Sequence, residues 1–399
     1  MLLSMSRKKR PENWISFAQP DEERPAPVFS PLPASPCLRR ILDSSHLLVS
    51  KLSLDDAAPE TLRHDNSTAG RRLLFDRLAA LQKGHRKARV VIVYEASCQG
   101  FGLYDDARDE GFECFVLAPT KIARSASHRR RKTDEEDAQR LLEILRAHLL
   151  AGNDLPKVWI PDPKTREDRE IVRSRGDVAE KITCVKAQVQ ALLKRNSLRR
   201  PSGTGKSWTK RFVGWLRGLT APQSPLAHGA RVALATLLRQ KAALEEEIAR
   251  LDQHVEALSQ EARYAEPVAA LRQIKGVGIF SAMVYLTELG DLSRFDNRKQ
   301  IGAYLGLAPS SHESGEIADR KGHITRQGPW RVRRVLCQCA WSRVRHDPGE
   351  KSAYARIAAK NPKHKKIAAV AVMRRLAILL WHLGRDAQKK SRCFEAEAA

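Results

Sequence analysis

The sequence predicts an α/β domain followed by helical domains, in a protein whose partner is a polyanion. Between residues 39 and 119, short segments rich in Val, Ile and Leu are typical of strands in a sheet that is covered on both faces. Further along the chain, apolar residues recur in steps of three and four, which is the period of a helix. The net charge of +25 and the pI near 10.1 favour a nucleic acid as the partner, with a ribosome and an anionic membrane as alternatives.

Length, cysteine usage and hydropathy predict a soluble cytoplasmic protein. The 399 residues, 42% of them hydrophobic, are enough to bury a core and to form roughly two or three domains. The seven cysteines are scattered without a CxxC pair, so we expect reduced thiols and no zinc site. Two arginines interrupt the apolar run at residues 367–383, which argues against a membrane span, and the start of the chain is unlike a signal peptide.

The N-terminal part is expected to hold one flexible segment and the α/β domain. Residues 1–36 mix charge with closely spaced prolines, which predicts a flexible basic arm. Residues 37–155 are expected to form the α/β domain. Its strands, in chain order, are predicted at residues 39–45, 46–54, 88–97 and 112–119, with helices between the later strands and after the last.

The middle region, residues 156–265, is expected to form long paired helices. Two apolar seams repeat every 3.5 residues, which is the spacing of a coiled coil. The seams are Val178, Ile182, Val185, Val189, Leu192 and then Leu237, Lys241, Leu244, Ile248, Leu251, Val255, Leu258. Pairing within one chain and pairing between chains both fit, and two ordinary amphipathic helices are the alternative. Residues 201–207 lack the first glycine of a phosphate-binding loop, because the chain has Arg200 there, and are expected to be a basic linker.

Residues 266–385 are expected to form a basic, helical C-terminal domain, followed by a tail at residues 386–399. Gly276 and Gly278 lie between two apolar helical patterns, which is typical of a helix-hairpin-helix. Backbone N–H groups at such a turn, and at the start of the following helix, bind phosphate without reading base sequence. A tight turn between two helices explains the same glycines without any ligand.

Four consecutive carboxylates follow four basic residues in the stretch RRRKTDEEDAQRL, residues 129–141. Thr133 and Glu136 have the spacing of a capping box, which explains part of the stretch by helix formation alone. Asp134 and Asp137 instead lie on the face that continues into the apolar stripe of the same helix. Carboxylates at the top of a buried stripe lose water, and a divalent cation would compensate that loss.

Two further acids precede this helix at strand positions. Glu95 ends the most apolar strand segment, and α/β sheets place functional groups at the carboxyl ends of their strands. Asp43 lies in the expected first strand. Together with Asp134 and Asp137, these acids could hold a pair of Mg²⁺ or Mn²⁺ ions for phosphodiester chemistry. Taken singly, Glu95 could be a strand-end charge in solvent and Asp43 an ordinary turn residue.

Three motifs in this order resemble a known family. They are the strand-end Glu95, the KTDxxDA element at residues 132–138, and the signature GLAPSSHESGEIADRKGHITRQG at residues 306–328, which RRVL follows shortly. The chain, from residue 40 to 383, resembles the RuvC-like transposases of the insertion-sequence-110/1111 type, which are related to Piv-type DNA invertases. The first strand departs from that pattern, because it lacks the usual glycine before Asp43 and the usual lysine after it.

The resemblance implies a fold, a chemistry and partners. It implies an RNase H-like, RuvC-like N-terminal domain with Asp43, Glu95, Asp134 and Asp137 as Mg²⁺ ligands, and a helical C-terminal transposase domain with a nucleophilic serine in the pair at residues 314–315. Similar proteins recombine DNA through a covalent phosphoserine, are guided by a structured bridge RNA of their own element, and act as homo-oligomers. The implied setting is the prokaryotic cytoplasm, in association with the nucleoid.

Composition alone leaves three serines as the nucleophile, namely Ser310, Ser311 and Ser314. Gly315 lets the backbone turn tightly beside a phosphate, which favours Ser314. No histidine is required by the spacing, so activation by a metal ion is favoured over a Ser–His pair. The basic residues expected to contact phosphates are Arg129, Arg130, Arg131, Lys132, Arg320, Lys321, Arg326, Arg331, Arg333 and Arg334.

The sequence therefore predicts a Mg²⁺-dependent, RNA-guided DNA recombinase. One alternative is a RuvC-like nuclease that uses water and needs only the four acids. The other is a catalytically inactive relic of a transposase that still binds nucleic acid.

Overall fold

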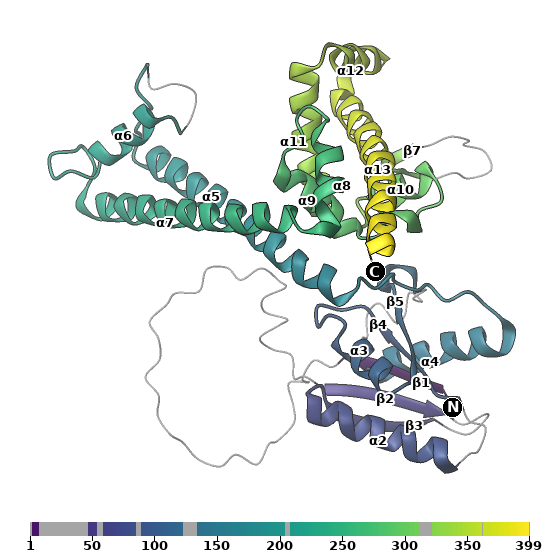
Figure 1. Cartoon of the computed structure of the whole chain (residues 1–399). Helices are drawn as coiled ribbons and strands as arrows, with labels where there is room; N and C mark the ends of the chain where they lie inside the picture. The colour runs from purple at the N-terminus through teal and green to yellow at the C-terminus, as the bar shows by residue number, and fades with distance from the viewer. Residues whose placement is uncertain are drawn as a thin grey trace, which may run out of the picture. The chain divides into compact units, whose positions relative to one another are not determined.

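The computed structural model describes residues 2–7, 47–53, 59–84, 89–122, 134–203, 208–311, 321–360 and 362–398 of the chain. The chain divides into two compact units, residues Met1–Ile160 and Pro161–Ala399. The first unit contains a five-stranded sheet with helices, and the second is helical apart from a two-stranded hairpin (Figure 1). The predicted order of an α/β part followed by helices is confirmed.

The sheet of the first unit has the strand order β3-β2-β1-β4-β5. Its strands are β1 (Leu2–Arg7), β2 (Leu47–Ser53), β3 (Glu60–Asp65), β4 (Val91–Glu95) and β5 (Glu113–Leu117). Strands β1, β2 and β3 are antiparallel neighbours, whereas β4 runs parallel to both β1 and β5. This arrangement of strands is consistent with an RNase H-like domain.

One strand of the sheet lies in the segment that was expected to be a flexible arm. The central place between β2 and β4 belongs to β1, at Leu2–Arg7, inside the segment expected to be a flexible arm. The expected first strand at residues 39–45, including Asp43, lies outside the described residues. The prediction of a flexible arm was wrong at residues 2–7, whereas the strand expected at residues 39–45 stays a prediction. Six residues before a basic, proline-rich stretch carry too little pattern to stand out.

Both faces of the sheet are covered by helices, as the apolar strand β4 requires. Ile92 and Tyr94 pack in one cluster with α2 (Thr68–Gly84) and α3 (Gly102–Asp109). Val91 and Val93 pack in a second cluster with α4 (Asp134–Ala151). Alternate residues of a strand point to opposite faces, so all four side chains are buried, none more than 7% exposed.

The second unit begins with two long helices that pair within the chain. Helices α5 (Pro163–Arg195) and α7 (His228–Ser259) contact each other, and α6 (Lys210–Gly218) packs at their far end (Figure 1). The predicted seam on α5, from Val178 to Leu192, is buried. On α7 the seam is buried at Lys241, Val255 and Leu258 and half-buried at its other positions. The pairing of these segments within one chain is therefore observed, and pairing between chains stays a prediction.

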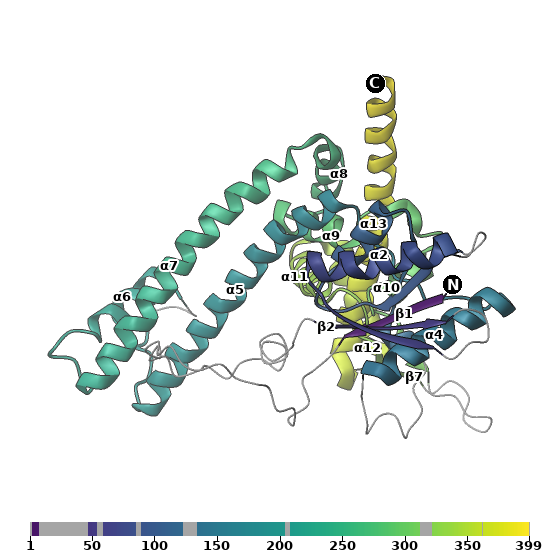
Figure 2. The same ribbon diagram turned by 90° about the horizontal axis from the view of Figure 1, so that it is seen from below.

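The remaining helices, apart from η3, contribute side chains to one apolar core. They are α8 (Ala262–Arg272), α9 (Ile279–Leu289), η2 (Leu292–Arg294), α10 (Arg298–Tyr304), α11 (Trp330–His346), α12 (Pro348–Lys360), η3 (Pro362–His364) and α13 (Lys365–Ala398). Helix α9 is apolar on nearly all sides and lies at the centre of this core. By length and composition the segment Pro362–Ser391 could cross a membrane, but Val372, Leu376 and Leu380 are buried in the core. Figure 2 shows α13 beside α8 and α10 from a second direction.

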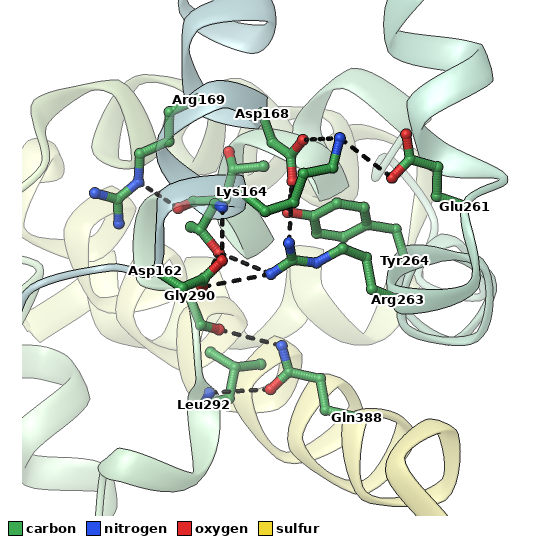
Figure 3. A network of polar contacts seen from close by, with 12 residues as sticks. Asp162, Lys164, Asp168, Arg169, Glu261, Arg263, Tyr264, Gly290, Leu292 and Gln388 are labelled. Atoms are coloured by element: carbon green, nitrogen blue, oxygen red, sulfur yellow. Dashed lines mark hydrogen bonds and ion pairs between the residues drawn. The ribbon is translucent and has the colours of Figure 1, made fainter. Parts of the chain in front are cut away.

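A buried polar network fixes the start of α5 against α8 (Figure 3). The Asp168 side chain is fully buried, and its Oδ2 accepts a hydrogen bond from the Tyr264 hydroxyl at 2.7 Å. Lys164 and Arg263 lie at 3.3 and 3.5 Å from its two oxygens. A buried carboxylate is tolerated only with such partners, so this group orients the long α5–α7 pair relative to the core.

Replacing Tyr264 with phenylalanine should test how much this network stabilises the fold. The change leaves a buried carboxylate without one donor, so we expect the free energy of unfolding to fall by about 1.5–3 kcal/mol. Tyr285→Phe is the matched control, because the Tyr285 hydroxyl donates to a neutral carbonyl, that of Ala377, at 2.7 Å. That control should cost only about 0.5–1.5 kcal/mol. Denaturant unfolding measures both losses. Equal losses of unfolding free energy in the two variants would show that the hydrogen bond to the Asp168 carboxylate stabilises the fold no more than the bond to a neutral carbonyl.

Candidate functional site

Glu95 is the last residue of β4 and is half-buried. Its neighbours are fixed by strand register. On one side Glu95 pairs with Leu117 of β5, and on the other side Met5 of β1 pairs with Tyr94. The next residues along these two parallel strands are Ser6 and Glu95. The pairing of β1 with β4 ends at Met5 and Tyr94, one residue before Glu95, and β1 contains no acidic residue.

The acids of residues 134–137 form the first turn of α4, as predicted. Asp134 and Asp137 are half-buried, whereas Glu136 is exposed. Glu135 forms an ion pair with Arg63 of β3. Leu141, one turn beyond Asp137, is buried in the cluster that includes Val91 and Val93 of β4. Asp134 and Asp137 thus occupy the face of α4 that packs on the strand of Glu95.

The described residues alone do not complete a metal site. Among them, no group of three or more His, Cys, Asp and Glu side chains could hold a metal ion. Of the four predicted ligands, Glu95, Asp134 and Asp137 lie in one unit, and Asp43 lies outside the described residues. Three of the predicted ligands therefore lie on β4 and in the first turn of α4. Strand β1 contributes no acid.

The predicted serine segment belongs to a β-hairpin. Strands β6 (Pro309–Ser311) and β7 (Lys321–Ile324) are antiparallel, and Ser311 pairs with Lys321. Residues 312–320, which include Ser314, Gly315 and Arg320, connect these strands and lie outside the described residues. The Ser310 hydroxyl donates to the carbonyl of His323 at 3.0 Å, so it has a structural partner within the hairpin.

Two glycines lock the base of this hairpin. Gly306 and Gly328 have φ of +62° and +73°, in the left-handed region that favours glycine. A Cβ on Gly328 would lie 1.9 Å from the carbonyl oxygen of Tyr304, and one on Gly306 would lie 2.2 Å from that of Gln327. Arg333 donates from one guanidinium nitrogen to the carbonyls of Leu305, Gln327 and Gly328. The two ends of the hairpin are thereby joined to each other and to α10 and α11.

Three of the arginines predicted to bind phosphate have partners within the chain. Arg331 donates to both carboxylate oxygens of Asp177, at 2.7 and 3.0 Å, and Arg334 pairs with Glu180. Arg333 is engaged by the carbonyls at the hairpin base. The contacts of Arg331 and Arg334 tie α11 to α5, because these two positions are three apart and share one face of α11. Of the other predicted residues, Arg326 is exposed, Lys321 opens β7, and residues 129–132 and Arg320 lie outside the described residues.

The predicted helix-hairpin-helix is a turn between α8 and α9. Gly276 has φ of +86°, and a Cβ there would lie 3.0 Å from the side chain of Ser342 on α11. This close approach to α11 accounts for Gly276. Gly278 precedes α9 and has open space around it. Phosphate binding at this turn stays a prediction.

Arg294, which no sequence motif singled out, supports α10, the helix before the hairpin. Its guanidinium lies over the rings of Phe295 and Tyr304, at 4.0 and 4.5 Å from their centroids, and donates to the carbonyl of Leu289. Burial lowers the pKa of this guanidinium from its ordinary value. A lone arginine beside a phenylalanine is a weak signal in sequence, because its partner Tyr304 lies ten residues further along the chain.

Comparison with known proteins assigns the family. A family described as Transposase, of the DEDD type, matches residues 51–197, and the Transposase IS116/IS110/IS902 family matches residues 268–355. Transposase y4qE of Sinorhizobium fredii is 31% identical over 326 residues, which cover 75% of this chain and 76% of that protein. The chain belongs to the IS116/IS110/IS902 family of transposases. This transposase is also 25% identical to the 43.6 kDa protein of insertion element IS110 from Streptomyces coelicolor, over 79% of this chain and 85% of that protein.

The two matched regions contain the two halves of the predicted site. Residues 51–197 include Glu95, Asp134 and Asp137 but begin after β1 and after Asp43. Residues 268–355 include the β6–β7 hairpin and its connecting segment. As the transposase of an insertion element, the protein is a DNA-cleaving and recombining enzyme and binds DNA. Domains of the DEDD type typically depend on a metal ion.

Proposed function

We propose that this transposase recombines DNA by attack of the Ser314 hydroxyl on a phosphodiester. The observation that carries the proposal is the β6–β7 hairpin. Its base is fixed by Gly306, Gly328 and Arg333, and its connecting segment contains Ser314 within the family match. In this step the Oγ–P bond forms, the bond from phosphorus to one deoxyribose oxygen breaks, and that oxygen takes up a proton. The bond energy is kept in the phosphoserine, so the reverse attack by a deoxyribose hydroxyl joins strands.

We propose that Asp43, Glu95, Asp134 and Asp137 hold Mg²⁺ or Mn²⁺ for this reaction. Support comes from the end of β4 and the first turn of α4, which place three of these acids on packed elements of one unit. When bound, the ion would polarise the phosphate and the serine oxygen. The acids contribute hard oxygen ligands, which suit Mg²⁺ and Mn²⁺ better than zinc.

Variants of the acids test this metal site. Asp137→Asn and Glu95→Gln should each lower adduct formation on DNA by about 10²-fold or more, since even outer-shell changes cost about 10–100-fold in metal affinity. Glu136→Gln is the control, because Glu136 is an exposed acid in the same helical turn. It should retain activity within a few fold. Isothermal titration with Mn²⁺ supplies a readout that is independent of activity, and equal Mn²⁺ affinity in all three variants would contradict the site.

We further propose that a structured RNA of the element guides the reaction and that copies of the chain act together. The net charge of +25 supports a second polyanion beside the DNA substrate. Purified transposase, mixed with DNA that carries the element junction, should form the covalent protein–DNA adduct when the flanking RNA is present. The adduct should not form when an unrelated RNA of equal length replaces the flanking RNA. Adduct formation without any RNA would exclude the guide.

A second function, DNA binding without cleavage, is favoured by one observation. Strand β1, which pairs with the strand of Glu95, contains no acidic residue, whereas the family resemblance implies an aspartate on the first strand. DNA that is bound but neither nicked nor linked to protein would identify the chain as an inactive member of the family.

A further inference from the structure

An exposed basic corner lies at the end of α12, at η3 and at the start of α13. From Lys351 to Arg385 the sequence holds nine lysines and arginines and no aspartate or glutamate. Five of these cations are exposed and close in sequence. They are Arg356, Lys360, Lys363, Lys365 and Lys366, and they define the basic corner. The family match ends at residue 355, so the basic corner lies beyond it.

Internal ion pairs do not compensate the charges of the basic corner. Within the part of the chain that the structure describes, none of its five cations forms an ion pair. The two acids that precede it, Asp347 and Glu350, are engaged elsewhere. Asp347 accepts the N–H groups of Gly349 and Glu350 at the start of α12. Glu350 pairs with Arg343 and Arg375 at 3.1 and 3.7 Å.

The position of the lysines is unfavourable for the helix itself. Lys365 and Lys366 are in the first turn of α13, which contains no acid. Cations there oppose the partial positive charge of a helix N-terminus, which acids stabilise instead. Helix α4 of the same chain, with four acids in its first turn, has the favourable arrangement. Folding therefore does not explain the lysines, whereas a polyanionic partner does.

We propose that the basic corner is a second contact with duplex DNA, made to phosphates and apart from the serine hairpin. This inference rests on the proposed action on DNA. Five exposed cations within eleven residues match the dense phosphate charge of a duplex. An anionic membrane fits less well, because a membrane-bound helix exposes an apolar face. Among the described residues, Ile367 is the only exposed large aliphatic side chain next to the corner. The apolar face of α13 is buried in the core.

The salt dependence of DNA binding tests the proposal. The full chain with Ser314→Ala, which should bind DNA without covalent chemistry, would be titrated with labelled duplex DNA by fluorescence anisotropy at several salt concentrations. The triple change Lys363→Gln, Lys365→Gln and Lys366→Gln should reduce the slope of log affinity against log salt by about 2–3, since each lost phosphate contact contributes about 0.9. A single Lys365→Gln change should reduce the slope by about 1.

The matched control removes the same charge elsewhere, through Lys83→Gln, Lys389→Gln and Lys390→Gln, all at exposed positions. Its slope should stay within about 1 of the parent slope. Equal slope losses in both triple variants would overturn the proposal, because net charge alone would then explain them. Reduced binding to anionic phospholipid vesicles or to a structured RNA, with DNA binding unchanged, would also overturn it. If the serine proposal fails, the unaltered chain forms no covalent adduct with DNA. The slopes of log affinity against log salt do not change in that case.

Discussion

Ser314→Ala should reduce formation of the covalent protein–DNA adduct by about 10³-fold or more, because it removes the proposed attacking oxygen. The measurement uses purified transposase with Mg²⁺, the flanking RNA of the element, and end-labelled DNA that carries the element junction. A denaturing gel separates the adduct from free and nicked DNA. DNA binding should be unchanged in the variant, which distinguishes lost chemistry from lost binding.

Ser310→Ala is the matched control within the same hairpin. Ser310 donates to the carbonyl of His323, so its loss should cost about 0.5–1.5 kcal/mol of stability and leave the adduct within a few fold. If the adduct forms in Ser314→Ala but not in Ser310→Ala or Ser311→Ala, the nucleophile is Ser310 or Ser311 and not Ser314. Nicked DNA that persists in Ser314→Ala without any adduct would identify a nuclease that uses water.

Gly328→Ala should lower the free energy of unfolding by roughly 2–5 kcal/mol, the sum of two costs. One is the left-handed backbone, with φ of +73°, and the other is the close approach of a new Cβ to the carbonyl of Tyr304, at 1.9 Å. Relief of that contact requires the hairpin to move away from α10. Adduct formation should therefore fall even under conditions in which the variant remains folded.

The control for Gly328 is another glycine of the same unit with a positive φ but open surroundings. Gly203 has φ of +85°, and a Cβ added there would meet no atom within 4 Å. Gly203→Ala should cost only roughly 1–2 kcal/mol, the backbone cost alone. Circular dichroism during thermal and denaturant unfolding compares the two variants. Similar losses of unfolding free energy in both variants would mean that the hairpin base accommodates a Cβ at residue 328 at little cost. The base would then not position Ser314.

Local sequence patterns predicted much of the fold because the relevant physics is local. The apolar run of β4 requires burial on both faces, and α2, α3 and α4 provide it. The first turn of α4 begins at Asp134, as its acids predict. The seam from Val178 to Leu192 is buried against a second long helix. Each of these predictions depends on a period that neighbouring residues repeat several times.

Such local patterns do not predict contacts between segments that are distant in the sequence. The place of β1 beside β4 depends on pairing across more than eighty residues, and six residues of strand carry too weak a signal. Arg331 and Arg334, which are predicted to contact phosphates, also pair with Asp177 and Glu180 of α5, and no sequence pattern indicated those pairs. Whether a charged side chain has an internal partner depends on which helix faces lie opposite each other, and only packing decides that.

Composition and motifs were sufficient to predict the order of an α/β part and a helical part, the basic character of the protein, and its place among the transposases. Three features required the folded chain. A serine segment belongs to a hairpin locked by Gly306 and Gly328, residues 2–7 form the strand that pairs with the strand of Glu95, and the cations of the basic corner have no ion-pair partner among the described residues. The physical reason is the range of the interactions. Periodicity and composition act between near neighbours, whereas close backbone approach, strand register and charge compensation depend on residues that only folding brings together.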